Sequence, residues 1–180
     1  MSDDFSLTPL NDAELPEFKR EMQRAFQLGY EAEFGPCDKP ILPEEDIDQS
    51  LEAEGAVAYA ARIDGVMAGG AVVKINRRTR HNELELLFVK AGTQSRGIGQ
   101  NIWNAIEKLY PDTEEWETFT PYFEKRNIHF YVNRCGFRIV EFFNPRHKLP
   151  LREGDGPCNM ADEAANYFFR FVKPMKPGRD

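Results

Sequence analysis

The chain has 180 residues, of which 41% are hydrophobic and 29% charged, and its formal net charge is −7. This length suits a single domain over residues 1–180, and no apolar run approaches the ~20 residues of a membrane-spanning helix, so we expect no membrane contact. The excess of acidic residues argues against a nucleic-acid partner, and the first residues lack the basic and apolar segments of a secretory signal.

Residues 5–10 form the first predicted strand. Asn11 and Asp12 then cap a predicted helix that runs to about Gly29. Its apolar residues recur at helical spacing: Leu15, Phe18, Met22 and Phe26. Pro43 opens a second helix with acidic residues in its first turn, where the helix dipole favours them.

A predicted hairpin occupies residues 56–75 and turns at Asp64-Gly65. Gly69 and Gly70 lie inside its second strand. Glycines at such positions indicate a bulge or a close approach of two backbones.

The middle of the chain predicts a strand at 83–89, a glycine-containing loop at 94–100 and a helix from about Gly97 to Tyr110. Four residues of this helix form its predicted buried stripe: Ile98, Ile102, Ile106 and Leu109.

The last part predicts a strand at 116–120, a helix at 123–135 and strands at 137–143 and 166–172. The order is mixed α and β, because the strands cluster too closely for a strict alternation of strands and helices. The loop 144–165 fits three roles: a lid, a disordered strip, or a dimer contact that would make the protein a homodimer.

Charge is distributed unevenly along the chain. Residues 1–56 contain 15 acidic and 4 basic residues, a balance of −11, whereas residues 57–180 have a balance of +4. This asymmetry suits either a site that takes a cation from one side and an anion from the other, or simply a solvated acidic helix face.

The three cysteines, Cys37, Cys135 and Cys158, are far apart in the sequence. Their spacing fits neither a zinc site nor a disulfide framework, so we expect no metal and a reducing cytoplasm as the location. Cys135 precedes a predicted helix end, where the dipole disfavours a thiolate, and this favours a buried structural thiol over a nucleophile.

The glycine-containing loop stands between a strand and a helix N-terminus. Free backbone N–H groups and the helix dipole favour an anion there, and glycines let a phosphate approach the backbone. The loop lacks the Lys-Ser/Thr pair of a P-loop and the third glycine of a dinucleotide fingerprint. A shorter phosphate cradle with Arg96 as its charge, and a plain glycine turn, remain as interpretations.

Residues 89–99 (VKAGTQSRGIG) resemble the acetyl-CoA pyrophosphate loop of the GNAT N-acetyltransferases, whose pattern is Q/R-x-x-G-x-G/A. The strand 83–89 (ELELLFV) resembles that family's fourth strand, and residues 128–137 (IHFYVNRCGF) resemble its later helix and exit turn. The resemblance implies a mixed α/β fold with a central, mostly antiparallel sheet flanked by helices. It also implies an acetyl-CoA-dependent N-acetyltransferase.

The resemblance also implies where acetyl-CoA binds. Backbone groups of the strand end at Leu87, Phe88 and Val89 would pair with the pantetheine arm. Loop amides would hold the pyrophosphate, and these belong to Gln94, Ser95, Arg96, Gly97, Ile98, Gly99 and Gln100. Asn127 is a further candidate contact.

Acetylation of an amine requires the neutral amine, and at pH 7 only about one alkyl ammonium in 2,500 is deprotonated. A base is therefore useful. Glu83 and Glu85 lie two residues apart on one strand and share a face, with His81 a weaker candidate on the same face. In some relatives of the resembled family a glutamate on this strand is the base, and Glu83 matches its position.

The departing thiol benefits from an acid, and in the resembled family a tyrosine on the later helix donates this proton. Tyr131 is the match. It lies five residues before Gly136, whereas the family spacing is four, so Tyr131 is rotated by ~100° unless a bulge absorbs the extra residue. Core packing is the alternative role.

The amine acceptor, a small molecule or a peptide, would enter between the N-terminal helices and the later strands. An acidic and aromatic wall suits a cationic amine, and six residues are candidates for it: Tyr30, Glu31, Glu33, Phe34, Trp116 and Phe143. Two other functions remain open. One is acetylation of protein lysines or N-termini, and the other is a CoA-binding sensor that has lost catalysis.

Overall fold

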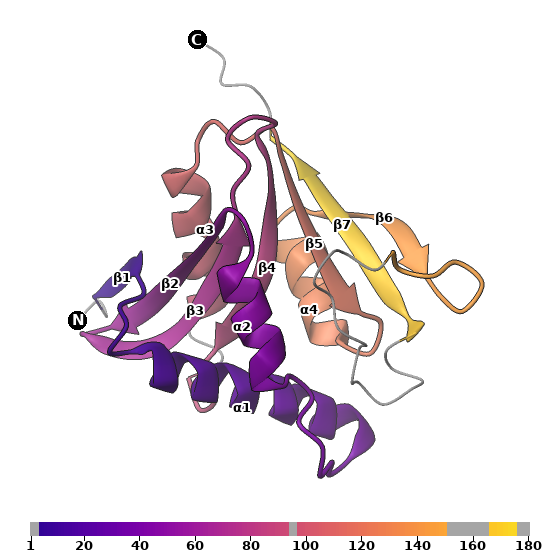
Figure 1. The fold of residues 1–180 in the computed structure, drawn as a ribbon, viewed down its shortest axis with the longest axis horizontal. Coiled ribbons are helices and arrows are strands. Elements are labelled where there is room, and N and C mark those ends of the chain that lie inside the picture. The colour runs from indigo at the N-terminus through magenta and orange to yellow at the C-terminus, as the bar shows by residue number, and fades with distance from the viewer. Residues whose placement is uncertain (1–3, 94–96, 151–165, 176–180) are drawn as a thin grey trace. The chain divides into compact units, whose positions relative to one another are not determined.

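The computed structural model describes residues 4–93, 97–150 and 166–175. Seven strands form a sheet in the order β1-β2-β3-β4-β5-β7-β6 (Figure 1). The chain divides into two compact units, and the sheet has strands in both. The first unit comprises Met1–Lys74 and Leu84–Pro111, and the second Ile75–Glu83 and Asp112–Asp180. That residues 1–180 form a single domain stays a prediction.

The strands of the first unit are β1 (Phe5–Pro9), β2 (Ala56–Ile63), β3 (Val66–Lys74) and the second part of β4 (His81–Val89). β2 and β3 are short, mostly apolar runs, and β3 is buried along almost its whole length. β2 pairs antiparallel with both β1 and β3. Asp64 and Gly65 both have positive φ, 49° and 82°, as the predicted two-residue hairpin turn requires.

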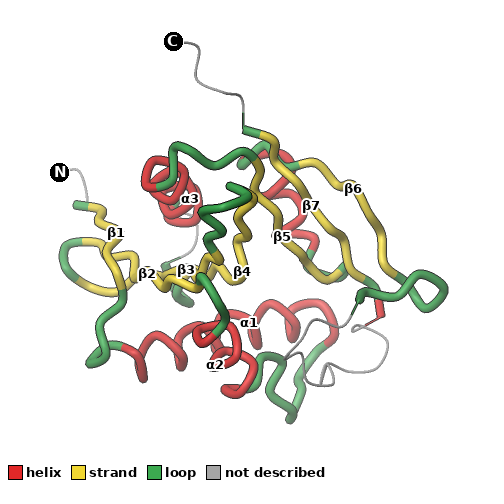
Figure 2. Tube along the Cα trace, turned by 45° about the horizontal axis from the view of Figure 1, so that its top comes forward, coloured by secondary structure: helices red, strands yellow, loops and turns green. Residues whose placement is uncertain are grey.

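Three helices pack on the strands of the first unit: α1 (Leu15–Phe34), α2 (Glu44–Glu52) and α3 (Ile98–Leu109). Figure 2 shows α1 and α2 on one face of these strands and α3 on the other. A Cβ built on Gly70 would lie 2.4 Å from the Phe18 ring of α1, and one on Gly69 would lie 3.3 Å from Ile102 of α3. Adjacent glycines of β3 therefore let a helix side chain approach each face. Both predicted features occur here, because a Cβ on Gly69 would lie 2.5 Å from the Phe88 carbonyl oxygen and the β2–β3 register shifts beside Gly69.

Two of the four apolar residues predicted along α1 lie in the core of the first unit. Phe18 and Met22 of α1 are fully buried together with Ile47 of α2. Phe18 meets Phe88 of β4 edge to face, with ring centroids 5.2 Å apart. This packing holds α1 against the strand that carries the proposed cofactor contacts.

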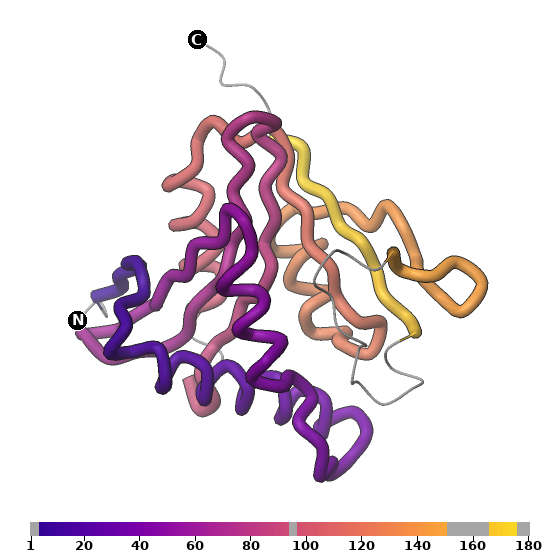
Figure 3. The backbone as a smooth tube through the Cα atoms, viewed as in Figure 1, coloured from indigo at the N-terminus to yellow at the C-terminus, as the bar shows by residue number. Residues whose placement is uncertain are grey.

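The second unit contains the start of β4, β5 (Glu115–Pro121), α4 (Lys125–His129), the π-helical turn η1 (Phe130–Arg134), β6 (Arg138–Phe143) and β7 (Phe168–Pro174). β7, the last strand in the sequence, runs between β5 and β6 and pairs antiparallel with both (Figure 3). β4 and β5 pair in parallel, which makes the sheet mixed and mostly antiparallel, as predicted.

Several boundaries differ from the prediction. α1 continues past Gly29 to Phe34, and the next residue, Gly35, has a φ of 84° that stops the helix. Leu109, predicted in the buried stripe of α3, is 50% exposed, and Trp103 is buried instead. None of the helices in the described ranges is both long and apolar enough to cross a lipid bilayer.

Candidate active site

The predicted phosphate cradle begins where β4 ends. The Lys90 amide donates to the Ala68 carbonyl at 2.8 Å, and the chain then turns through Gly92, whose φ is 85°. Gln94, Ser95 and Arg96 lie outside the described residues. Gly97 re-enters with a φ of 70° and caps α3.

The N-terminus of α3 has the properties of an anion site. The first intrahelical bond runs from the Asn101 amide to the Gly97 carbonyl, so the amides of Ile98, Gly99 and Gln100 precede the hydrogen-bonded ladder. Among the described residues, no atom apart from the chain neighbours lies within 4 Å of a Cβ built on Gly97. Gly97 is therefore not required by internal packing, and its left-handed conformation sets the direction in which the chain enters α3. The helix dipole favours an anion at this end of α3.

The last residues of β4 are held by β3. A Cβ on Gly69 would lie 2.5 Å from the Phe88 carbonyl oxygen and 3.3 Å from the Val89 Cα. Phe88 is buried, while Leu87 and Val89 are half-buried. The strand end predicted to carry the pantetheine is thus fixed by a backbone contact that only glycine permits.

Glu85, on β4, is engaged in a local network. Its Oε2 lies 2.9 Å from the Lys74 Nζ, and its Oε1 accepts a hydrogen bond from the Ser50 hydroxyl at 3.1 Å. Its side chain is 19% exposed. A carboxylate neutralised by an ammonium and a hydroxyl is poorly suited to accept a proton, so Glu85 is the weaker of the two base candidates.

Glu83, in the second unit, is half-buried and lies directly beside Glu117 in the parallel β4–β5 register. Partners in a parallel ladder share a face, so Glu83 and Glu117 project from the same side of the sheet. His81 is opposite Glu115 on that side, but it is exposed.

Tyr131 lies in η1, and this turn accounts for its unusual spacing. The Cys135 amide donates to the Phe130 carbonyl at 3.0 Å, a bond that spans one residue more than in an α-helix. Gly136 follows with a φ of 83°. This π turn gives the chain a place for the extra residue between Tyr131 and Gly136, although the role of Tyr131 stays a prediction.

The Tyr131 side chain is 5% exposed and packs among aromatic residues. Its ring centroid is 5.7 Å from that of Phe137 and 5.6 Å from that of Phe171. Burial raises the pKa of Tyr131 well above its ordinary value, although hydrogen bonds with Thr118 and Thr120 oppose that rise. The phenol is therefore protonated at neutral pH, as an acid must be.

The two catalytic candidates of the second unit lie on opposite faces. Side chains alternate along β5, so Glu117 projects with Glu83, while Thr118 projects toward Tyr131. Base and acid candidates thus flank β5 from its two sides.

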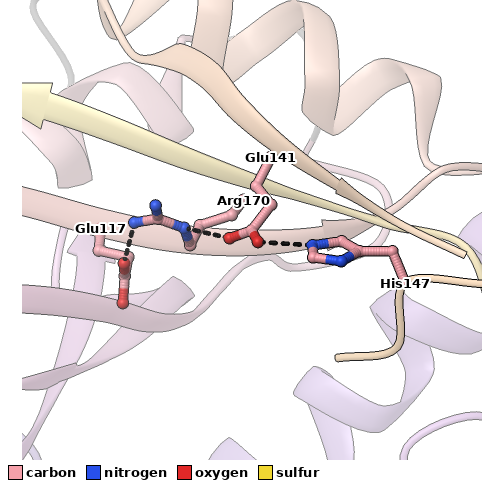
Figure 4. Close-up of polar contacts among 4 residues, drawn as sticks. All are labelled: Glu117, Glu141, His147 and Arg170. Atoms are coloured by element: carbon pink, nitrogen blue, oxygen red, sulfur yellow. Dashed lines mark hydrogen bonds and ion pairs between the residues drawn. The ribbon is translucent and has the colours of Figure 1, made fainter. Parts of the chain in front are cut away.

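A charged network crosses the face that carries Glu83 (Figure 4). The Arg170 guanidinium of β7 donates to Glu117 Oε2 at 2.7 Å through Nη1 and to Glu141 Oε1 at 3.0 Å through Nε. Glu141 Oε2 lies 2.7 Å from the His147 Nε2. The hydrogen bond from His147, with that from Arg170, holds the pKa of Glu141 below its usual range.

The sequence analysis missed this network. Arg170, Glu117 and Glu141 belong to three strands that are distant along the chain, and only their pairing brings them together. Each of the three strands carries a charged residue between uncharged neighbours, but nothing local in the sequence indicates that these residues meet. His147 is held by the tight turn at Asn144 and stacks on Phe143, with ring centroids 5.3 Å apart.

The predicted acceptor residues of α1 differ in their surroundings. Tyr30 is buried and packs on the exposed Phe34, with ring centroids 4.8 Å apart. Glu31 Oε1 accepts hydrogen bonds from the Gln27 side chain at 2.9 Å and from the Cys37 amide at 3.3 Å. Its carboxylate therefore holds the loop after α1, whereas Glu33 is exposed.

Trp116 and Phe143 do not form one wall, contrary to the expectation. Trp116 is fully buried and shares the face of Thr118, while Phe143 pairs with Phe168 on the face of Arg170. Phe143, only 3% exposed, lies on the side of Glu83, whereas Trp116 is a core residue of the second unit.

The remaining predicted residues are placed as follows. Asn127, in α4, is half-buried, and its carbonyl accepts the Phe130 amide. Cys135 is 3% exposed, in keeping with a structural thiol. Within residues 4–93, 97–150 and 166–175, no group of three or more His, Cys, Asp or Glu side chains is placed to hold a metal ion.

Comparisons with known proteins agree with this architecture. The family model described as "Acetyltransferase (GNAT) family" matches residues 17–137. The uncharacterized protein YrkN of Bacillus subtilis is 50% identical over 171 residues, covering 92% of this chain and 90% of that protein.

Solved structures resemble the chain at low sequence identity. The ribosomal-protein-S18-alanine N-acetyltransferase from Escherichia coli has a TM-score of 0.70 at 14% identity, with 98% of this chain and 97% of that chain covered. Spermidine N-acetyltransferase from Vibrio cholerae, in complex with CoA and spermine, has a TM-score of 0.66 at 11% identity, with 94% and 95% covered.

Proposed function

The chain belongs to the GNAT acetyltransferase family, and we propose that it transfers the acetyl group of acetyl-CoA to a primary amine by direct attack in a ternary complex. The acceptor is a small cationic molecule or a peptide amine. The observation that carries this proposal is the placement of Glu83 and Tyr131 on opposite faces beside β5 in the second unit.

These two residues meet the two proton demands of the reaction. Glu83 takes a proton from the amine, directly or through water, because an ammonium has no lone pair with which to attack. Tyr131 holds a proton that the departing sulfur can accept. Because base and acid are different side chains, neither has to serve both the amine and the thiol within one acetyl transfer.

The acetyl donor is a thioester, and the chain's own backbone suits its carrier. The amides of the first turn of α3, behind the left-handed Gly97, fit a pyrophosphate. The end of β4, at Leu87 to Val89, offers backbone groups for an extended arm. The V. cholerae relative in the comparison binds CoA, which supports the same cofactor here.

The alternative of a CoA-binding sensor loses its main support. That interpretation depended on a tyrosine rotated out of register, and a π turn such as η1 is a way for a helix to accommodate one extra residue, which supports the enzyme. Acetylation of protein N-termini or lysines uses the same chemistry and differs only in the acceptor.

The direct test is turnover. Purified protein with acetyl-CoA is offered a panel of polyamines, amino-acid amides, aminoglycosides and short peptides, and release of CoA thiol is measured together with the mass of the acetylated product. We expect acetylation of at least one cationic primary amine. Binding of acetyl-CoA by calorimetry without acetylation of any amine would favour the sensor.

A variant tests the cradle. Gly97→Val adds a side chain at the helix entrance and should weaken acetyl-CoA binding by about tenfold or more, which is about 1.4 kcal/mol. Gly65→Val is the matched control, because Gly65 has a similar φ of 82° in the β2–β3 turn. Equal acetyl-CoA affinity in the two folded variants, measured by calorimetry, would contradict the assignment.

A further inference from the structure

Two buried hydroxyl groups of β5 face Tyr131. Thr118 and Thr120 are 1% and 2% exposed. They alternate with Glu117 and Phe119 along the strand, so both project from the face that η1 covers. Buried hydroxyl groups are kept where they have hydrogen-bond partners, because losing water without a partner is unfavourable.

The geometry around Tyr131 gives these hydroxyl groups their partner. Thr118 is directly opposite Phe171 in the β5–β7 ladder, and the Tyr131 ring packs on Phe171 at 5.6 Å. Side-chain hydrogen bonds with Thr118 and Thr120 act to lower the pKa of Tyr131, which places both threonines beside its phenol group. Tyr131 of η1 therefore packs on the face of β5 and β7 that carries Thr118, Thr120 and Phe171.

We propose that Thr118 and Thr120 are positioning residues for proton transfer by Tyr131, and that their hydroxyl groups donate hydrogen bonds to the phenolate formed when Tyr131 gives up its proton. This inference rests on the proposed function and on Tyr131 as the acid.

The proton balance shows when the hydrogen bonds matter. Glu83 first takes the ammonium proton and passes it to solvent; the neutral amine nitrogen then bonds to the acetyl carbon and loses its next proton to Glu83. The carbon–sulfur bond breaks with its electron pair on sulfur, and Tyr131 gives its proton to that sulfur. A phenolate remains at Tyr131 until solvent returns a proton.

Burial works against this step. An apolar environment disfavours the charged phenolate and raises the pKa of Tyr131, which makes it a weaker acid. Hydrogen bonds to the charged form oppose that effect, as donors do in an oxyanion hole. Thr118 and Thr120 are the groups placed to donate them.

The test removes the hydroxyl and keeps the shape. Thr118→Val should lower kcat with acetyl-CoA by about tenfold or more, the effect of one lost hydrogen bond to a charged oxygen. Thr118→Ser should restore turnover, and Thr120→Val gives a second, independent measurement if Thr118→Val does not fold. Thr113→Val is the control, because Thr113 is also buried but its hydroxyl accepts from Asn82 at 2.8 Å.

The leaving group separates a chemical role from a structural one. The CoA thiol has a pKa of ~8.5 and benefits from an acid, whereas a nitro-substituted thiophenol leaves without one. The kcat loss in Thr118→Val should therefore shrink when the acetyl donor is the thioester of that thiophenol. Equal losses with the two donors would show a structural role and overturn the inference.

A readout without substrate completes the test. The proton resonance of the buried Tyr131 hydroxyl, assigned by its loss in Tyr131→Phe, should shift in Thr118→Val and stay in place in Thr113→Val. An unchanged resonance, or full turnover of a Thr118→Val/Thr120→Val double variant, would also overturn the inference. If wild-type protein acetylates no amine, the proposed function itself fails; the outcomes above concern an active wild type.

Discussion

Glu83 and Glu85 are separated by a single residue of β4 but have different neighbours. Glu85 forms an ion pair with Lys74 of β3 and accepts a hydrogen bond from Ser50 of α2. Both of its carboxylate oxygens therefore have partners within the fold. Glu83 lies beside Glu117, whose own charge is held by Arg170. We therefore expect the same substitution to have different consequences at Glu83 and at Glu85.

Glu83→Gln should reduce turnover at pH 7 by about 100-fold, and the loss should shrink as pH rises, because free amine then becomes abundant without a base. Glu85→Gln should instead lower the free energy of unfolding by about 1 kcal/mol, because it leaves the half-buried Lys74 without its carboxylate. Urea unfolding and steady-state kinetics on both variants measure these effects. Full turnover of Glu83→Gln at pH 7 would place the base elsewhere.

Glu141 makes stability depend on pH. Its folded-state pKa is lowered by His147 and Arg170, so its contribution is complete above the unfolded-state pKa of ~4.3 and is lost as pH falls through the folded value. Below about pH 4.5 the wild type should lose melting temperature more steeply than Glu141→Gln. Parallel Tm–pH curves for the two proteins would show that the network of Figure 4 has no such effect.

At the scale of the element, η1 inserts a residue where an α-helix has none. Its i→i+5 bond between Phe130 and Cys135 lets the chain carry an extra residue while Tyr131 stays packed on Phe171. π turns of this kind interrupt helices most often at functional sites.

Deletion of Asn133 should convert this turn into ordinary α-helix and leave Tyr131 in place. The exposed Asn133 bonds only locally among the contacts found for it, to His129 at 2.8 Å. We expect retained turnover and a melting temperature equal to or above that of the wild type. Deletion of the exposed Asn104 is the control, since α3 has no extra residue and loses its register by ~100°. A loss of turnover in the Asn133 deletion, with the fold intact by circular dichroism, would contradict this account.

At the scale of the whole molecule, the negative charge is concentrated in residues 1–56. The balance of −11 over residues 1–56 gives the protein an acidic segment that attracts cations and that salt screens over a Debye length of ~8–10 Å. Some of these acidic residues stabilise the fold. Glu31, for example, accepts a hydrogen bond from the Cys37 amide in the loop after α1.

The Michaelis constant for a cationic acceptor should therefore rise with ionic strength, while that for acetyl-CoA stays level or falls. Glu33→Gln removes an exposed charge and should flatten the salt dependence, whereas Glu31→Gln should also lower the melting temperature. Both constants are measured at low and high salt in the three proteins. A salt-independent acceptor constant, or a best acceptor that is neutral or acidic, would make the acidic segment only a solvated face.

Local patterns determined the mixed fold, the apolar face of α1, the Asp64-Gly65 hairpin and the helix-capping glycine of the loop after β4, because each depends on residues close together in the chain. The spacing of Tyr131 revealed an extra residue but not how the helix accommodates it. Only tertiary structure decided that Glu85 is paired, that Trp116 and Phe143 face opposite sides, and that Arg170 joins Glu117 to Glu141. The reason is register: β7 enters between β5 and β6 from the far end of the chain, and a bulge in β6 sets which side chains share a face.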